Sequence, residues 1–244
     1  MHIGANVIEN YGRGIDRACK TYADELSKAL SEIDTSDATL FIDEAIRLTQ
    51  HFCDLSAEST AMASALFYDM LREMQIGEKF GANPVTARNR EATEKAIRSV
   101  SKGESDQELI AKVLGRCIER VELEGKRAAG ETVVQNARKD PSKPKYARVP
   151  SGVETCDFCM MLASRGFVYA SKETASGKGG HYHANCACRI VPSFGKTEVE
   201  GYDPDAYFDK WKHPEKYPEL REARNARRRE LYAERNGTRG QAEQ

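Results

Sequence analysis

The chain contains 244 residues, of which 40% are hydrophobic and 31% are charged, and its formal net charge is −1. These values are typical of a globular protein with one or two hydrophobic cores and a heavily charged surface. The near-zero charge excludes a general electrostatic attraction to nucleic acid or to an anionic membrane, so either would need a local basic patch. No apolar run approaches the roughly 18–20 residues of a membrane span, and the first residues lack the pattern of a secretory signal. We therefore expect the protein to act in a cytosol or in a particle assembled there.

The first part of the chain has the apolar spacing of helices. Between residues 15 and 33 apolar side chains recur every three or four positions, which predicts one helix. A second helix is predicted over residues 40–52. A third carries an apolar stripe, widened by Phe67 and Leu71, whose members are Met62, Leu66, Met70 and Met74. We interpret this stripe as packing into a helical core, although methionine-rich faces also bind partners because Met adapts to irregular surfaces.

The clearest predicted helix follows Gly103. Ser105 and Glu108 have the spacing of a capping box, in which each side chain can bond a free backbone N–H at the start of a helix. Residues 109–121 then show a continuous apolar face, and Asp140 followed by Pro141 predicts the end of the helix. Residues 1–140 are therefore assigned to a helical domain.

The rest of the chain divides into three predicted segments. Residues 141–150 are basic and contain prolines, which predicts an extended, solvated linker and a domain boundary. A compact module is predicted over 146–195, with short strands at 167–169 and 189–191. Residues 196–244 form an aromatic and then Arg/Glu-rich tail, whose aromatic residues dock either onto the protein itself or onto a partner. The expected fold class is mainly α, with a small α+β zinc-knuckle module after the helical domain and a charged C-terminal tail.

A cluster of thiol and imidazole side chains lies within the module. Its members are Cys156, Cys159, His183, Cys186 and Cys188. The Cys-x-x-Cys turn places two thiolates on one side of a tight loop, as two corners of a tetrahedral zinc site. In an extended chain the last two cysteines point to the same face, because side chains alternate along a strand. The cluster therefore predicts one zinc ion, and the spacing leaves open which four of the five candidates bind it.

Other uses of the cluster are weaker interpretations. Disulfides would require an oxidised particle, and a redox Cys-x-x-Cys normally opens a helix in a βαβ setting, which the surrounding sequence lacks. A catalytic zinc keeps an open position for water, whereas here there are surplus ligands. A module of about 50 residues is also too small to be stable on its core alone. We therefore predict a closed, structural zinc site.

Four stretches of the module form a recognisable pattern. They are residues 146–150, 154–159 and 162–166, and the closing stretch His-Ala-Asn-Cys-Ala-Cys-Arg-Ile-Val-Pro at 183–192. With this pattern the module resembles the phage Mu F-like minor head proteins, and in particular the branch carried by phages and prophages of actinobacteria. Many members have Pro after the histidine, where this chain has Ala184. The similarity covers about a fifth of the chain.

The resemblance implies a minor capsid protein of a phage head that works by binding rather than catalysis. Its implied partners are the portal and capsid proteins, with nonspecific contact to packaged DNA and with neither a membrane nor a small-molecule substrate. Such a protein would assist head assembly and DNA packaging or delivery. It would lie inside the virion, or in the host cytoplasm during assembly.

Three other functions compete with that of a structural head protein: two enzymatic activities and nucleic-acid binding. A zinc-stabilised nuclease of the His-Asn-His type could use His183 and Asn185, but no suitable downstream histidine pair completes its metal site. An ADP-ribosyltransferase would have to rest on the Glu-Val-Glu of residues 198–200, which is usually a solvated edge. Nucleic-acid binding could use the linker and the arginines of the tail, and would be salt-sensitive. His213 is expected to be a surface or packing histidine rather than a further ligand.

Overall fold

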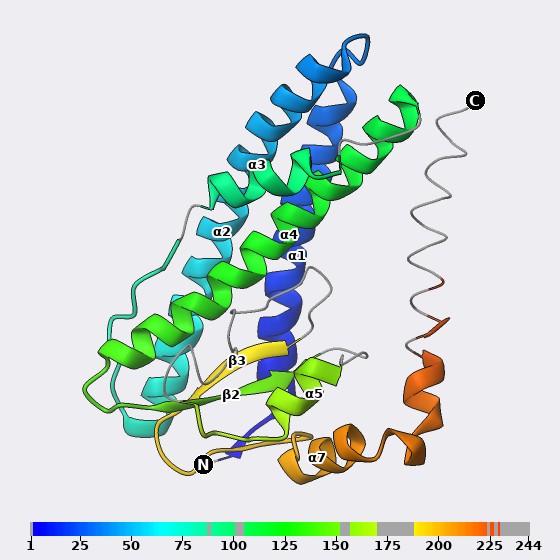
Figure 1. Ribbon diagram of the computed structural model, residues 1–244. Helices are drawn as coiled ribbons and strands as arrows, with labels where there is room; N and C mark the ends of the chain where they lie inside the picture. Colours follow the sequence, from blue (N-terminus) through cyan, green and yellow to red (C-terminus); the bar gives the residue numbers. More distant parts are fainter. Residues whose placement is uncertain are drawn as a thin grey trace.

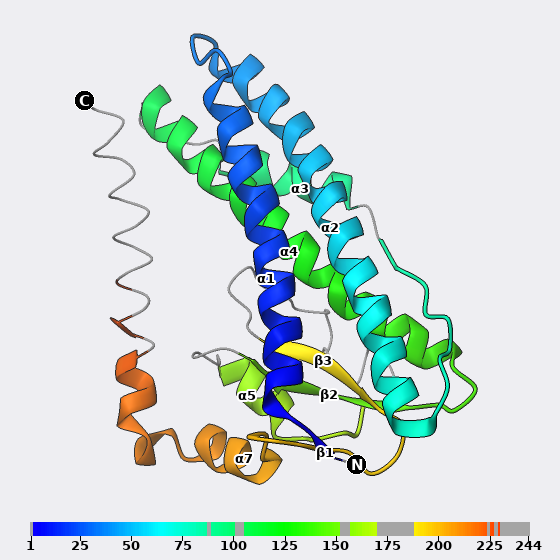
Figure 2. The ribbon, with the colours of Figure 1, turned by 180° about the vertical axis from the view of Figure 1, so that it is seen from behind.

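The computed structural model describes residues 2–86, 89–100, 105–151, 157–169, 188–223, 225–226 and 229. Three long helices, α1 (Ala5–Ser31), α2 (Ala38–Ile76) and α4 (Asp106–Lys139), form an elongated bundle. A short helix, α3 (Arg90–Arg98), crosses its side, and a small β layer lies at one end (Figures 1 and 2). The expectation of a mainly helical protein is confirmed.

Helix α2 is one continuous helix where the sequence predicted two. Asp37 begins it by accepting the backbone N–H groups of Thr39 and Leu40, and Gly77 ends it in the left-handed conformation, with φ 84°. No helix-breaking residue lies between the two predicted helices. The buried residues between their apolar stripes are small or carry a hydroxyl, and Thr60 bonds back to the carbonyl of Ser56 within the helix. The gap in large apolar residues therefore marks a close helix contact rather than a loop.

Helix α4 begins and ends where the sequence predicted. The Ser105 hydroxyl accepts the N–H of Glu108, and the helix stops at Asp140. Its middle turns pack closely on α2, because Ala57 and Ala61 of α2 face Ala128 of α4. The Thr60 hydroxyl donates to the carbonyl of Gly125 over 2.8 Å and joins the two helices at their crossing.

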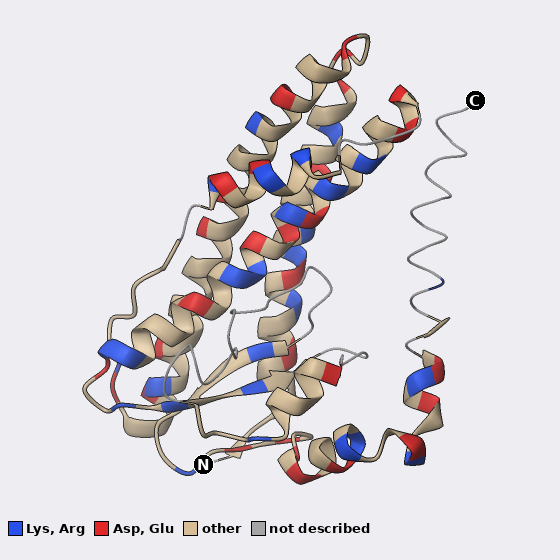
Figure 3. Ribbon diagram, in the orientation of Figure 1, with Lys and Arg blue, Asp and Glu red and all other residues tan. Residues whose placement is uncertain are grey.

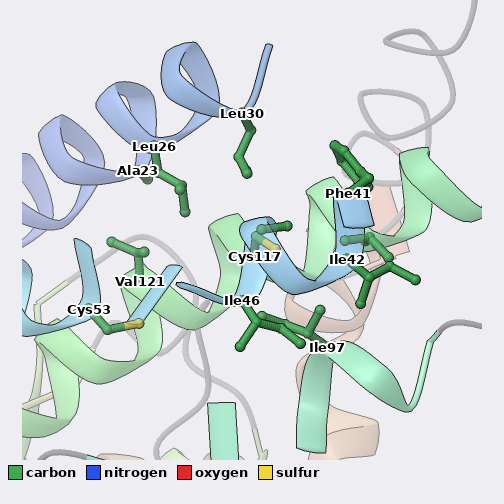
Figure 4. Close-up of a cluster of buried hydrophobic side chains, with 12 residues drawn as sticks. Ala23, Leu26, Leu30, Phe41, Ile42, Ile46, Cys53, Ile97, Cys117 and Val121 are labelled. Atoms are coloured by element: carbon green, nitrogen blue, oxygen red, sulfur yellow. The ribbon is translucent and has the colours of Figure 1, made fainter. Parts of the chain in front are cut away.

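The main hydrophobic core lies at the end of the bundle away from the β layer. Side chains from all four helices converge there (Figure 4). The buried members are Ala23, Leu26, Leu30, Phe41, Ile42, Ala45, Ile46, Cys53, Ile97, Val113, Cys117 and Val121. Cys53 and Cys117 thus serve as small buried apolar residues, and burial raises the pKa of the Cys117 thiol to about 11.

The predicted core role of the methionine stripe is wrong. Met62 is 61% exposed, Leu66 71%, Met70 38% and Met74 46%, whereas Phe67 and Leu71 are buried. Helix α2 has two apolar faces, and the bundle covers the one that carries the small residues, because these allow close approach to α4. Periodicity alone does not distinguish the two faces.

Within the described residues, the β layer consists of two separate strand pairs. Strands β2 (Lys145–Pro150) and β3 (Cys188–Ser193) pair antiparallel, with Ala147 opposite Val191, so the predicted strand at 189–191 is confirmed. Of the predicted strand at 167–169, only Tyr169 pairs, as a single bridge to Tyr146. Strand β1 (His2–Ile3) pairs parallel with β4 (Glu198–Val199).

The predicted solvated linker differs from the structure over β2. This segment is extended, but four of its six residues are buried, because β2 and β3 pack against the bundle. Tyr146 and Ile190 share a hydrophobic cluster with Tyr68 of α2 and Val133 of α4. Apolar packing therefore crosses the boundary that the composition predicted.

Residues 77–86 run along the bundle as an extended strap. The Asp69 carboxylate accepts the N–H groups of Phe80, Gly81 and Ala82, and Asn136 of α4 bonds both the N–H and the C=O of Asn83. Side chains thus supply the backbone partners that a neighbouring strand would otherwise give. Among the described residues, no helix is long and apolar enough to cross a bilayer.

Candidate metal centre

Two of the five predicted ligands lie within the described residues. These are Cys159 and Cys188, whereas Cys156, His183 and Cys186 lie outside them. Cys159 is in the first turn of α5 (Asp157–Ala163), and Cys188 is the first residue of β3. Both side chains are buried, and they contact each other as a separate two-residue cluster. The fold thus brings together one cysteine from each half of the motif.

Helix α5 is held in place by the strand pair next to it. The Tyr169 hydroxyl donates to the carbonyl of Leu162 over 2.8 Å, and the backbones of Tyr169 and Tyr146 exchange two hydrogen bonds. Leu162 and Tyr169 also belong to the cluster that joins the strands to the bundle. The position of Cys159 therefore follows from packing between α5 and β2.

Strand β3 is fixed to helix α1 beside Cys188. The Arg189 guanidinium donates to Asp16 over 2.5 Å and to the carbonyl of Gly12 over 3.2 Å. A Cβ at Gly12 would lie 2.8 Å from the Ser151 hydroxyl and 3.2 Å from the Arg189 Nε, so a larger residue would push both side chains away from α1. The sequence motif included Arg189 but did not indicate this anchoring role.

The aromatic part of the tail packs against the same place. The Tyr202 hydroxyl donates to the carbonyl of Ala163 at the end of α5, over 2.5 Å, and its ring meets Phe167 edge-on. Burial raises the pKa of Tyr202 and of Tyr207, and the nearby Cys188 adds to both shifts. Helix α7 (Pro204–Lys212) therefore begins close to the cysteine pair. This contact favours docking of the aromatic segment onto the protein itself, although Phe208 and Trp211 at the outer face of α7 are exposed.

The chemistry of the described cysteines fits a structural zinc site. Zinc prefers thiolate and imidazole ligands and needs four of them, and two buried thiols from opposite ends of the motif supply half of that set. Within the described parts of the chain, no group of three or more His, Cys, Asp or Glu side chains is arranged to hold a metal ion. The remaining candidates are the three motif residues outside those parts.

Two alternative sites have other roles in the structure. In the Glu-Val-Glu sequence, the Glu200 carboxylate accepts the N–H of Ala5 over 3.1 Å at the N-terminus of α1, which is a capping contact. His213 ends α7 with a partly exposed ring, and its Nδ1 lies 3.3 Å from Glu215. His213 is thus a surface residue, as predicted.

Sequence reasoning missed one residue at the centre of the layer. Arg148 lies on β2 opposite Ile190, and it is the largest of the fully buried side chains. The basic composition around it indicated a solvated linker. The signal that could have revealed the strand is the run Tyr-Ala-Arg-Val at 146–149, in which an arginine stands among residues typical of a buried strand.

Lys and Arg residues alternate with Asp and Glu residues along α1 to α4 and along α7 (Figure 3). Several form pairs one turn apart, such as Lys112 with Glu108 and Arg98 with Glu94. Such pairs are typical of solvated helix faces. The described helices therefore give nucleic-acid binding little electrostatic support.

Comparison with known proteins places the chain in a phage protein family. It belongs to the VG15 protein family, whose model matches residues 2–213. The Gene 15 protein of Mycobacterium phage L5 is 27% identical over 210 residues, covering 67% of this chain and 70% of that protein. The Gene 15 protein of Mycobacterium phage D29 is 28% identical over 132 residues, covering 41% of this chain and 46% of that protein. No solved structure matches the chain.

Proposed function

We propose that this chain is a minor structural protein of a phage head, which binds portal and capsid proteins and assists head assembly and DNA packaging or delivery. Membership of a family with relatives in two mycobacteriophages supports a role in a phage. The Mu F-like motif of residues 146–192 supports a role in the head. On this proposal the protein acts by binding, in the virion or in the host cytoplasm during assembly.

The observation that carries the proposal is the contact between Cys159 and Cys188. The two cysteines are far apart in the sequence but adjacent and buried in the fold, as a single closed site requires. In the proposed site, thiolates and the imidazole of the motif would hold zinc, which when bound supplies a cross-link rather than a reacting water. The chain's own contribution is to fix the two cysteines, through the Tyr169 and Arg189 contacts at their sides.

Zinc content tests the site directly. We expect about one zinc ion per chain in protein purified without chelator, and a large loss in Cys159→Ala and in Cys188→Ala. Cys117→Ala is the matched control, because Cys117 is equally buried but lies in the bundle core. Zinc-free, reduced and folded wild-type protein would refute the site.

Composition of particles tests the role in the head. We expect the chain to be recovered at low copy number with purified heads of a phage that encodes it, together with the portal protein. Heads assembled without the gene should lack either packaged DNA or infectivity. Normal, infectious heads that never contain the chain would refute the proposal.

The alternative is a zinc-stabilised nuclease or nucleic-acid-binding factor, and the same purified protein tests it. Incubated with DNA and Mg²⁺ or Mn²⁺, the protein should leave the DNA intact. Cutting that is lost in His183→Ala would overturn the proposal in favour of catalysis.

A further inference from the structure

Helix α7 has an inner and an outer side, which differ in exposure. Tyr207 and Lys210 lie three residues apart, share a side of the helix and are half-buried. The Lys210 Nζ lies 5.5 Å from the centre of the Tyr207 ring. On the outer side, Phe208 and Trp211 are exposed. The helix therefore turns the side that carries Tyr207 toward the rest of the protein.

The start of α7 is fastened to the end of α5. The Tyr202 hydroxyl donates to the carbonyl of Ala163 over 2.5 Å, just before α7 begins. The Pro204 ring then packs on Gly166, where a Cβ would lie 3.4 Å from it. Helices α5 and α7 are in contact, and they lie next to each other in both views of the ribbon (Figures 1 and 2). The segment is thus held on the helix that carries Cys159.

The tyrosines of this segment lie beside the cysteine pair. The rings of Tyr202 and Tyr207 are 5.9 Å apart. Burial raises the pKa of both hydroxyls, and a negative charge on the nearby Cys188 sulfur raises it further. Cys159 and Cys188 are only 2% and 6% exposed, although each lies at the start of its own helix or strand. The aromatic segment is therefore part of what keeps the two thiols from water.

We propose that α7 is a lid on the cysteine pair, so that the two thiols become accessible, and a metal ion held there exchanges, when α7 leaves its place on α5. The part that concerns metal exchange rests on the zinc site of the proposed function, whereas access to the thiols does not. None of the nine described residues of α7 is fully buried. A segment with so few buried contacts opens locally while the bundle stays folded.

Alkylation of the thiols tests the lid in the absence of metal. The full chain, reduced and treated with chelator, is exposed to iodoacetamide, and modification of Cys159 and Cys188 is followed by mass spectrometry. Tyr202→Phe removes the hydrogen bond to α5, and Tyr207→Ala removes the inner ring but keeps a good helix former. When opening is fast, the rate of modification follows the population of the open state.

The expected changes follow from the contacts that each variant removes. Tyr202→Phe should speed modification about fivefold, the factor that corresponds to one hydrogen bond of about 1 kcal/mol. Tyr207→Ala should speed it about tenfold, the factor that corresponds to about 1.4 kcal/mol for a half-buried aromatic ring.

Two variants and one internal thiol serve as controls. Phe208→Ala removes a ring of the same size from the exposed side of α7 and should leave the rates at the wild-type values. Tyr207→Phe keeps the inner ring and should do the same. Cys117, which is fully buried in the bundle, should stay unmodified in every variant. Should Tyr207→Ala also expose Cys117, Tyr202→Phe alone decides.

Zinc exchange tests the second part of the proposal. Protein loaded with about one zinc ion per chain is mixed with an excess of a coloured chelator. Release should be faster in Tyr202→Phe and Tyr207→Ala by the same factors, and unchanged in Phe208→Ala. Trp211 is the only tryptophan of the chain, so its fluorescence anisotropy reports the motion of α7. Zinc added to the metal-free protein should raise this anisotropy, because metal binding and docking favour each other reciprocally.

The outcomes separate the lid from the zinc site. Equal modification rates in the wild type, Tyr202→Phe and Tyr207→Ala would overturn the lid. Faster modification together with unchanged zinc release would overturn its role in metal exchange. A wild type that binds no zinc would refute the zinc site of the proposed function and metal exchange with it, whereas the modification rates would still decide whether α7 covers the thiols.

Discussion

Gly125 of α4 packs directly against α1 and α2, and its replacement by alanine gives a sharp test of the packing. A Cβ at this position would overlap the Ser56 hydroxyl of α2 and lie 2.7 Å from the Cys19 sulfur of α1. Both neighbours are buried, so their side chains must rotate into a crowded core or the helices must move apart. Overpacking of this kind costs about 3 kcal/mol, and the better helix propensity of alanine returns about 1 kcal/mol. We therefore expect Gly125→Ala to destabilise the protein by about 2 kcal/mol.

The same substitution elsewhere in α4 serves as the control. Nothing lies within 4 Å of a Cβ at Gly115, so Gly115→Ala should stabilise the protein by up to about 1 kcal/mol. In thermal unfolding followed by circular dichroism, the midpoint should fall by roughly 4–8 °C for Gly125→Ala and rise slightly for Gly115→Ala. Adding Ser56→Ala should recover part of the loss, because the nearest remaining atom of residue 56 would be its Cβ at 3.5 Å. A rise in stability with Gly125→Ala would refute the close crossing.

Three further predictions concern contacts outside the crossing. Burial raises the pKa of Asp140, but hydrogen bonds from Ser142, Arg72 and Tyr68 outweigh this effect and leave that pKa below its ordinary value. Folding thus favours the charged carboxylate, so its contribution to stability is present above about pH 4 and lost as the pH falls further. Asp140→Asn should lower the free energy of unfolding by about 3 kcal/mol at pH 7 and remove this loss of stability at acid pH. An unchanged pH dependence of urea unfolding below about pH 4 would contradict this prediction. Asn136→Ala removes both hydrogen bonds to the Asn83 backbone and should lower the free energy of unfolding by about 2 kcal/mol. Limited proteolysis should then cut within residues 77–86, whereas continued resistance would show that other contacts hold the strap. Tyr202→Phe keeps the ring against Phe167 but removes the hydrogen bond to Ala163, and should lower the unfolding free energy by about 1 kcal/mol. Unchanged urea unfolding would count against docking of the aromatic segment through this bond.

Local chemistry made the ends of α4 predictable. Ser105 and Asp140 mark them, because capping and breaking depend on a few neighbouring residues. The direction in which α2 faces was not predictable in the same way. Whether α2 buries its methionine stripe or its small-residue face depends on Gly125 and Ala128 of α4. The apolar pattern within α2 carries no information on these residues.

Part of the candidate site followed from spacing. The motif predicted that its two halves lie together, and the described cysteines, Cys159 and Cys188, do so. The contacts around the two cysteines could not be predicted from the motif, because Arg189 is held by Asp16, which is far away in the sequence. The burial of Arg148 did not follow either: the basic composition of residues 141–150 predicted a linker, whereas packing of β2 against the bundle buries this side chain.

The packing of the strands also changes what loss of metal should do. The motif suggested that zinc is needed because a module of about 50 residues has too small a core of its own. In the structure, however, Tyr146 and Ile190 share a core with α2 and α4. If zinc occupies the proposed site, its removal should therefore loosen the start of α5 and the start of β3 without melting the strand pair.

Hydrogen exchange read by mass spectrometry tests this expectation, with and without chelator. Peptides that contain Cys159 or Cys188 should exchange faster after zinc removal, and Cys159→Ser should reproduce the effect if the chelator fails to remove the metal. Peptides covering Ala147 and the α4 segment around Val133 should stay protected, because their burial depends on the bundle. Loss of protection throughout β2 and β3 would show that the metal, rather than the helices, stabilises the layer.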